Sequence, residues 1–120
     1  MAIYAPPLGL EPEVQVRLQM LREAAQDHRK VRMAYRDAAQ TQSQRVVRPL
    51  GCFYWGRVWT LAAWCEVRRD FRSFRLDRMD ALQRLDGPTD QFRDEAGKTL
   101  ADYLRSAAPA AALAHLTDSA

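Results

Sequence analysis

Apolar residues in the first part of the chain recur with helical spacing. From Pro12 to about His28 they follow one another at steps of four, three and four residues, which places them on one face of an α-helix. They are Val14, Leu18, Leu21 and Ala25. Pro12 suits the first turn, where its nitrogen needs no hydrogen bond. The pattern predicts an amphipathic helix packed against the rest of the domain.

Short runs of alternating apolar and polar residues follow, and they predict strands. The predicted strands are residues 30–36, 44–50, 57–65, 71–76 and 81–86. The segments between them are expected to be a polar hairpin loop at 37–43, an aromatic turn at 51–56, a charged turn at 66–70 and a bend or helical turn at 76–79. Pro49 places the end of the second strand at an edge, a bend or a bulge.

The third predicted strand is apolar on both sides. Trp59, Leu61, Ala63 and Cys65 share one side, and Val58, Thr60, Ala62 and Trp64 share the other. A strand with two apolar faces is expected in the middle of a sheet, covered on both sides. Trp59 is therefore expected in the core, whereas Trp64 is open to either a core or a base-stacking role.

One helix followed by five closely spaced strands indicates an α+β fold that is mainly β. We expect a small, bent antiparallel barrel of the Sm-like or SH3-like kind, with the N-terminal helix packed on it and a short helix near residues 99–108. The predicted divisions are a linker-like lead-in at 1–11, helix plus barrel at 12–87, a C-terminal extension at 88–108 and a flexible, alanine-rich tail at 109–120.

The length and composition fit one globular domain. The chain has 120 residues, of which 48% are hydrophobic and 28% charged. It has neither a run of about 18–20 apolar residues nor the features of a signal peptide, so we expect a cytoplasmic protein without membrane contact. Cys52 and Cys65 have no metal-site spacing, which leaves a reduced, buried pair or an occasional redox link.

Positive charge is concentrated in the middle of the chain. Residues 29–78 contain twelve Lys and Arg against four Asp and Glu, a balance of +8, whereas the remainder carries −5. Eleven of the twelve cations are arginine, whose planar guanidinium binds phosphates and stacks on bases. Either an anionic, nucleotide-like partner or a coding bias toward arginine accounts for this composition.

Catalytic and metal-binding motifs are absent from the sequence. The histidines are His28 and His115, at a predicted helix end and in the tail, and no paired-cysteine, H-E-x-x-H or phosphate-loop motif occurs. Asp70 and Asp77 lie among arginines and suit ion pairing better than acid catalysis. We expect no enzymatic activity, no metal and no cofactor.

The arginines of the fourth predicted strand cannot all face one way. Arg72 shares a side with Phe74, whereas Arg75 points to the other side. At least one arginine is therefore expected at the core boundary, where it needs a partner such as Asp77 or a backbone carbonyl. Arg72 and Arg75 are favoured as ligand contacts, while Arg78 is open to either a binding or a bracing role.

Two stretches resemble the WYL domain of bacterial transcriptional regulators. WTLAAWC, followed by RRDFRSFRLDRM, is similar to the W-Y-L strand and the R-x-F-R-L-D-R-I segment of that family. The positions that match are Tyr35, Arg45, Pro49, Trp59, Leu61, Arg72, Phe74, Arg75, Asp77 and Arg78. Thr60 stands at the family's tyrosine and Met79 at its isoleucine, so base stacking at position 60 is lost although a hydroxyl remains.

The resemblance implies an effector-sensing domain with an Sm-like fold. It further implies a phosphate-bearing ligand, such as a nucleotide or single-stranded nucleic acid, and a helix-turn-helix DNA-binding partner domain that these residues do not contain. The candidate ligand-binding residues are Arg72, Arg75, Arg78, Tyr35, Arg36, Arg48, Thr60 and Trp64. The alternative is a homodimerisation or protein-interaction module, with the first helix and the aromatic stretch 51–56 as interface. The chain is expected to be either a sensor domain cut from a regulator or a standalone module.

Overall fold

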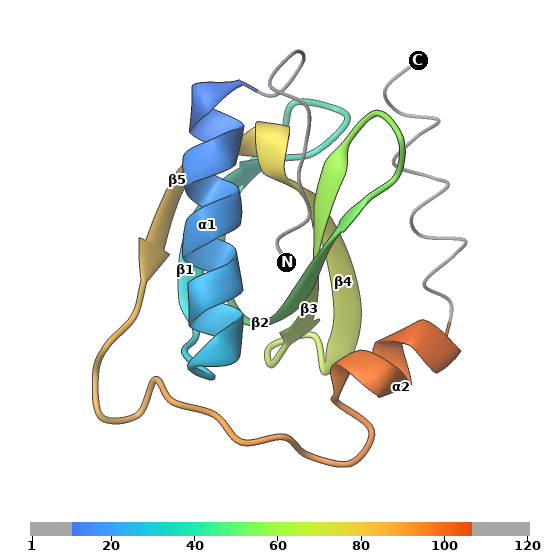
Figure 1. Ribbon diagram of the computed structural model, residues 1–120. Coiled ribbons are helices and arrows are strands. Elements are labelled where there is room, and N and C mark those ends of the chain that lie inside the picture. The colour runs from blue at the N-terminus through green and yellow to red at the C-terminus, as the bar shows by residue number, and fades with distance from the viewer. Residues whose placement is uncertain (1–10, 107–120) are drawn as a thin grey trace.

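The computed structural model describes residues 11–106, which form one bent sheet with a helix against it (Figure 1). The elements are α1 (Pro12–Gln26), β1 (Val31–Arg36), β2 (Gln42–Tyr54), β3 (Trp59–Cys65), β4 (Asp70–Arg75), the 3-10 helix η1 (Leu76–Arg78), β5 (Met79–Arg84) and α2 (Leu100–Arg105). The five strands are antiparallel in the order β4-β3-β2-β1-β5. The expected mainly β architecture with an N-terminal helix and a short C-terminal helix is confirmed.

Helix α1 packs lengthwise on the sheet, as the spacing of its apolar residues predicts. Its buried residues are Val14, Leu18, Leu21 and Ala24. Ala24 is buried and the predicted Ala25 beside it is half-buried, since steps of three and four from Leu21 both lead to the same helical face. The helix ends two residues before His28, which adopts a left-handed conformation with φ of 56°.

Strand β2 is longer than the pattern predicts and serves two halves of the sheet. It pairs with β1 through Gln42–Val47 and with β3 through Arg48–Tyr54. The register shifts between Pro49 and Gly51, so the predicted irregularity at Pro49 is confirmed. This bulge adds a residue and bends the strand, which lets one strand follow the curved sheet.

The prediction of a turn at residues 51–56 was wrong in most of its length. Gly51–Tyr54 continue β2, because Cys52 and Phe53 pack on opposite sides of the sheet. The reversal comes at Trp55, whose backbone N–H donates to the carbonyl of Val58 at 3.0 Å, and Gly56 supplies the φ of +86° that such a tight reversal needs. Strand β5 also begins at Met79 and ends at Arg84, two residues earlier than predicted at each end.

All seven residues of β3 are buried, which confirms its predicted central place. Trp59, Leu61, Ala63 and Cys65 face the main core under α1; this side of the sheet is called the core side. Ala62 faces a smaller cluster with Phe53, Phe71, Leu100 and Tyr103, where α2 packs on the sheet; this side is called the α2 side.

Strands β4 and β5 lie at the two edges of the sheet and are joined by η1. Tyr35 of β1 connects the two halves, because its hydroxyl accepts the backbone N–H of Arg75 at 2.9 Å and its ring meets Phe74 edge-on at 5.0 Å. Burial raises the pKa of Tyr35, partly offset by that hydrogen bond and by the charge of Arg78. The Tyr35 hydroxyl therefore stays protonated and fixes β1 against the end of β4. Closure into an Sm-like barrel stays a prediction.

Some predictions fall outside the described residues. These are nearly all of the lead-in at 1–11, the tail at 109–120 and the end of the helix expected at 99–108. The division at residue 87 stays a prediction. Within residues 11–106, no helix is long and apolar enough to cross a membrane.

We expect Tyr35→Phe to lower the free energy of unfolding by about 1–2 kcal/mol, because the buried N–H of Arg75 loses its acceptor. Tyr54→Phe is the matched control. The Tyr54 side chain is 52% exposed and its hydroxyl donates to the carbonyl of Gly56 at 2.9 Å, so the loss there should stay below about 0.5 kcal/mol. Urea unfolding of both variants measures the difference, and equal effects would contradict a bridging role for Tyr35.

Candidate ligand-binding site

The predicted ligand residues lie in three places. The first place surrounds η1 and contains Tyr35, Arg36, Arg75 and Arg78. The second lies toward the α2 side and contains Arg48, Thr60 and Trp64. The third is the core side of β4, where Arg72 lies. The structure therefore does not bring them together as one surface. Each place differs in how far its polar groups are already used by the protein itself.

Arg75 is buried and bound to a carboxylate. The residue is 7% exposed, and its Nε and Nη2 donate to Oδ1 and Oδ2 of Asp77 at 2.9 and 2.5 Å. Burial alone would raise the pKa of Asp77, but the hydrogen bonds and charge of Arg75 hold it below its ordinary value. The predicted core-boundary arginine with Asp77 as its partner is thus confirmed, and this pair braces η1.

Arg36 is also paired, at the outer end of β1. Its Nε lies 2.9 Å from both carboxylate oxygens of Asp80, and its Nη1 donates to Gln40 at 3.1 Å. Arg78 is half-buried near Tyr35. These two arginines flank the same turn as Arg75, so the region around η1 is held by contacts within the protein.

Arg48 is the centre of an ionic network below the sheet. Its Nε and Nη1 donate to Glu66 and Glu95 at 2.8 and 2.6 Å, and Lys30 reaches Glu66 at 2.9 Å. Burial would lower the pKa of Arg48, but the hydrogen bonds to Glu95 and Glu66 raise it overall. Its guanidinium also lies over the ring of Phe92 at 5.6 Å. This network connects β2, the β3–β4 turn and the segment that leads into α2.

Thr60 and Trp64 are engaged on the α2 side. Thr60 is fully buried, and its hydroxyl accepts a hydrogen bond from Nε1 of Trp55 at 2.8 Å. Trp64 is also buried, with Phe71 edge-on to it at 5.0 Å and the ammonium group of Lys98 over its ring at 5.5 Å.

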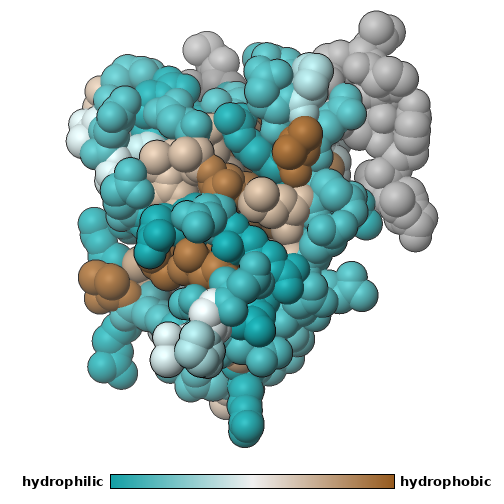
Figure 2. All heavy atoms as spheres, turned by 90° about the vertical axis from the view of Figure 1, so that its left-hand side faces the viewer, coloured by the Kyte–Doolittle hydropathy of each residue, from teal (hydrophilic) through white to brown (hydrophobic). Residues whose placement is uncertain are grey.

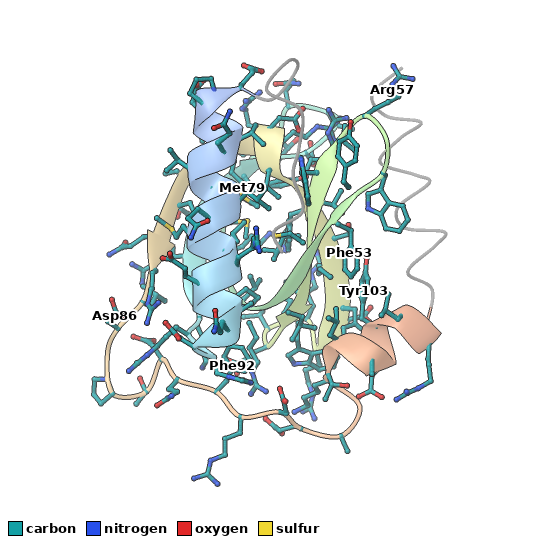
Figure 3. The ribbon with its side chains drawn as sticks, viewed as in Figure 1. Phe53, Arg57, Met79, Asp86, Phe92 and Tyr103 are labelled. Atoms are coloured by element: carbon teal, nitrogen blue, oxygen red, sulfur yellow. The ribbon has the colours of Figure 1, made fainter. Side chains whose placement is uncertain are left out.

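The α2 side as a whole is an aromatic cluster. Figure 3 shows Phe53 and Tyr103 next to each other where α2 meets the sheet, with their ring centroids 6.3 Å apart. Thr99 caps α2 through Asp102, whose pKa falls to about 2 mainly because the backbone N–H and hydroxyl of Thr99 bind the carboxylate. Helix α2 is therefore a well-formed cover of this side.

Arg72 differs from these arginines because the charges that act on it most strongly are those of two cations, Arg45 and Arg68, while Asp70 acts less strongly in the opposite direction. Arg72 is half-buried, and its guanidinium lies 5.8 Å from the ring centre of Phe74. Within residues 11–106 its side chain forms no hydrogen bond or ion pair. Burial lowers its pKa, and the charges of Arg45 and Arg68 lower it further. An anion bound here would offset both the cost of burying the Arg72 charge and its repulsion from Arg45 and Arg68.

Sequence reasoning did not name Arg45 and Arg68 among the candidate ligand-binding residues. Arg45 lies opposite Met33 in the β1–β2 ladder, on the same side of β2 as buried Val47. Strand alternation could have identified Arg45 from the sequence, because two residues before buried Val47 it places a cation on the core side of the strand. Arg68 lies in the exposed β3–β4 turn. Its charge acts on Arg72 together with that of Arg45, which the pattern alone does not give. We call Arg45, Arg68 and Arg72 the arginine triad.

The described part of the chain shows neither a cluster of metal-ligating side chains nor a reactive thiol. No group of three metal-ligating side chains occurs within residues 11–106. Cys52 and Cys65 are both free thiols, and burial raises the pKa of Cys52 to about 12, so it stays protonated. The arginine triad is thus the strongest candidate for a binding site.

The sequence and the fold match a known class of domain. Residues 17–84, more than half of the chain, match the WYL domain family, and the chain belongs to it. Among solved structures, the chain is similar to proteasome accessory factor B/C (PafBC) of Arthrobacter aurescens, with 24% identity and a TM-score of 0.57. That likeness covers 73% of this chain and 15% of PafBC. It supports the fold, and the segment carrying α2 lies outside the residues that match the family.

We expect Asp77→Asn to lower the free energy of unfolding by about 1–2 kcal/mol, because it leaves the buried Arg75 cation without its carboxylate. Asp80→Asn removes the carboxylate of the more exposed Arg36 pair and should cost below about 1 kcal/mol. Chemical denaturation at pH 7 compares the two variants. A larger loss for Asp80→Asn would contradict the bracing role of Arg75.

The stabilisation from Asp77 should also depend on pH. Because the pKa of Asp77 is lower in the folded state, its contribution is complete above the unfolded pKa and is lost as pH falls through the folded pKa. The difference in stability between wild type and Asp77→Asn should thus be constant from pH 7 to about pH 5 and shrink below about pH 4. If the difference in stability grew on acidification, the pKa of Asp77 would be higher in the folded state than in the unfolded state, which contradicts this prediction.

Proposed function

We propose that this WYL domain is the effector-sensing part of a bacterial transcriptional regulator that works in the cytoplasm. The domain acts by binding and catalyses no reaction. Its effector carries phosphate groups, and single-stranded nucleic acid fits best. In a complete regulator the domain would control a helix-turn-helix domain that binds operator DNA. Family membership supports the regulatory role, and the arginine triad supports the chemistry of the effector.

The observation that carries the proposal is the environment of Arg72. Arg36, Arg48 and Arg75 each bind a carboxylate, which neutralises them within the fold. Arg72 instead has no carboxylate bound to its side chain within residues 11–106, and the charges of Arg45 and Arg68 lower its pKa more than that of Asp70 raises it. A fold gains nothing from bringing like charges together at a half-buried place. The arrangement is therefore better explained by an anionic ligand than by stability.

Phosphate is the anion that this group of residues suits best. Guanidinium groups bind phosphate oxygens in pairs, and several of them together can bind the repeating charges of a nucleic-acid backbone. A flexible single strand can bring successive phosphates to arginines that come from β2, the β3–β4 turn and β4. The concentration of arginine in residues 29–78 agrees with this chemistry.

We expect a labelled single-stranded oligonucleotide of about 12 nucleotides to bind the wild-type chain, with affinity that falls as salt rises. If three arginines each neutralise one phosphate, the slope of log affinity against log salt should be roughly −2. Arg72→Ala should weaken binding about tenfold or more and reduce the size of the slope by roughly 0.7. Fluorescence anisotropy at four salt concentrations measures both quantities.

Arg57→Ala is the matched control for this experiment. Arg57 is an exposed arginine at the tip of the β2–β3 hairpin, at the opposite end of β3 from the β3–β4 turn (Figure 3). The Arg57→Ala substitution removes the same charge as Arg72→Ala and should change the affinity less than about twofold. Equal effects of the two variants would show that binding depends on net charge alone. Absence of oligonucleotide binding to the wild-type chain would exclude the proposal.

A second candidate function is homodimerisation through the outer face of α1. Val16 is 65% exposed, and with Met20 it lines an apolar surface hollow that also includes Gln19 and Arg84. Figure 2 shows apolar side chains gathered in the middle of the face that carries α1 and β5, with hydrophilic residues around them. An apolar centre with a polar rim is the usual form of a protein interface.

This second function predicts a dimer that Val16→Glu disrupts, because the new carboxylate would lose its water at the interface. Light scattering at several protein concentrations measures the molar mass. Glu13→Gln, a charge change one turn earlier on α1, is the control and should leave the mass unchanged. A wild-type monomer at the highest concentration would exclude this function and leave the first proposal untouched.

A further inference from the structure

Aromatic rings that could stack on bases are separated from the arginine triad by the sheet itself. Consecutive residues of a strand point to opposite sides, so Arg72 and its neighbour Phe71 project away from each other. Phe71 contacts Trp64 and Tyr103, at ring-centre distances of 5.0 and 5.7 Å. These rings belong to the cluster that α2 covers, and a ligand held by Arg72 would meet the other side of the sheet.

The rings on the core side are buried. Tyr35, Trp59 and Phe74 are all part of the main core, where they contact other side chains and have no open face. Phe74 lies beneath Arg72 and is 1% exposed. The Arg72 guanidinium thus lies between that ring and any ligand.

Tyr54 is the exposed ring on the core side within the described residues. It pairs with Trp59, whereas Arg72 pairs with Ala63. Four residues of strand separate these two places, which is about 13 Å. A base whose phosphate contacts Arg72 cannot lie on a ring at that distance.

The family's tyrosine position offers no substitute. Thr60 stands there in this chain, and its side chain is buried with the hydroxyl bound to Trp55. The charged groups that act most strongly on Arg72 are the guanidinium groups of Arg45 and Arg68, whereas Cys65 and Asp70 act less strongly in the opposite direction. Arg45 also donates to the hydroxyl of Ser43 at 3.2 Å. The guanidinium groups suit phosphate oxygens, and in-plane contacts to phosphate would engage their N–H donors. Within residues 11–106 no exposed aromatic ring stands beside Arg72, so the base faces are left without an aromatic partner.

We infer that the arginine triad binds the sugar-phosphate backbone of its ligand and does not read or stack on the bases. This inference rests on the proposed function and adds the part of the ligand that is recognised. The effector class is then any flexible single strand of phosphodiesters, whatever its sequence. Sequence preference in the regulator would have to come from another part of the protein.

Two unnatural oligomers separate the two kinds of contact. An abasic 12-mer keeps the phosphodiester chain and lacks every base, whereas a thymine peptide nucleic acid keeps the bases on an uncharged backbone. The full chain should bind the abasic oligomer within about threefold of oligothymidylate and oligodeoxyadenylate, and it should not bind the peptide nucleic acid. A stacked base would instead contribute about tenfold or more.

Variants of Arg72 link the result to the site. Arg72→Ala should weaken the binding of the abasic oligomer and of oligothymidylate by the same factor. Arg72→Lys should retain part of the affinity, because an ammonium group still attracts phosphate. Arg45→Gln is a second variant at the triad, and Arg57→Ala is the control. Thermal unfolding confirms that each variant is folded at the assay temperature.

The outcomes distinguish the inference from the function on which it rests. Binding of oligothymidylate with a tenfold or greater loss for the abasic oligomer, or binding of the peptide nucleic acid, would overturn backbone recognition and keep the proposed function. No binding of any phosphodiester oligomer would overturn both. Equal binding of abasic and natural oligomers that is unaffected by Arg72→Ala would also overturn the inference, because the backbone would be bound elsewhere.

Discussion

The burial of β3 on both faces is the constraint from which the rest of the structure follows. An apolar strand of this kind needs two covers, and α1 and α2 supply them from opposite ends of the chain. The neighbouring strands must then place their own side chains between those two covers or at the rim. Charged residues in β2 and β4 then either bind carboxylates, as Arg48 does, or stay half-buried without an ion pair within residues 11–106, as Arg72 does.

The arginines show both outcomes. Arg48 and Arg75 are largely buried and each is satisfied by acidic side chains, as the cost of an unpaired buried charge requires. Arg72 is half-buried, yet the charges of Arg45 and Arg68 act on it more strongly than that of Asp70. The same alternation that brings Arg75 to Asp77 sends Arg72 to the opposite side, away from that carboxylate. One strand thus carries a structural arginine and a candidate binding arginine three residues apart.

Much of the fold could be predicted from the sequence, because it depends on local alternation. The two faces of β3, the irregularity at Pro49 and the helical face of α1 all follow from the spacing of apolar residues. The turn at 51–56 could not be predicted correctly, since Cys52 and Phe53 look like loop residues until both sides of β2 are known to be covered. Arg48 shows the same limit for the site: Glu66 and Glu95 are 18 and 47 residues away in sequence, and no local pattern reveals that they neutralise it. Arg45 was visible as a cation beside buried Val47, but its approach to Arg72 needs the bend of the sheet.

The central claim is that Arg72 is free to bind a ligand while Arg36, Arg48 and Arg75 hold the fold. The most direct measurement is the side-chain Nε–Hε signals of the arginines, followed by nuclear magnetic resonance as single-stranded oligonucleotide is added. The account predicts that the Arg72 signal shifts with saturation, together with that of Arg45, and that the signals of Arg48 and Arg75 stay in place. Shifts confined to Arg36, Arg48 or Arg75, with the Arg72 signal unchanged by bound oligonucleotide, would contradict it.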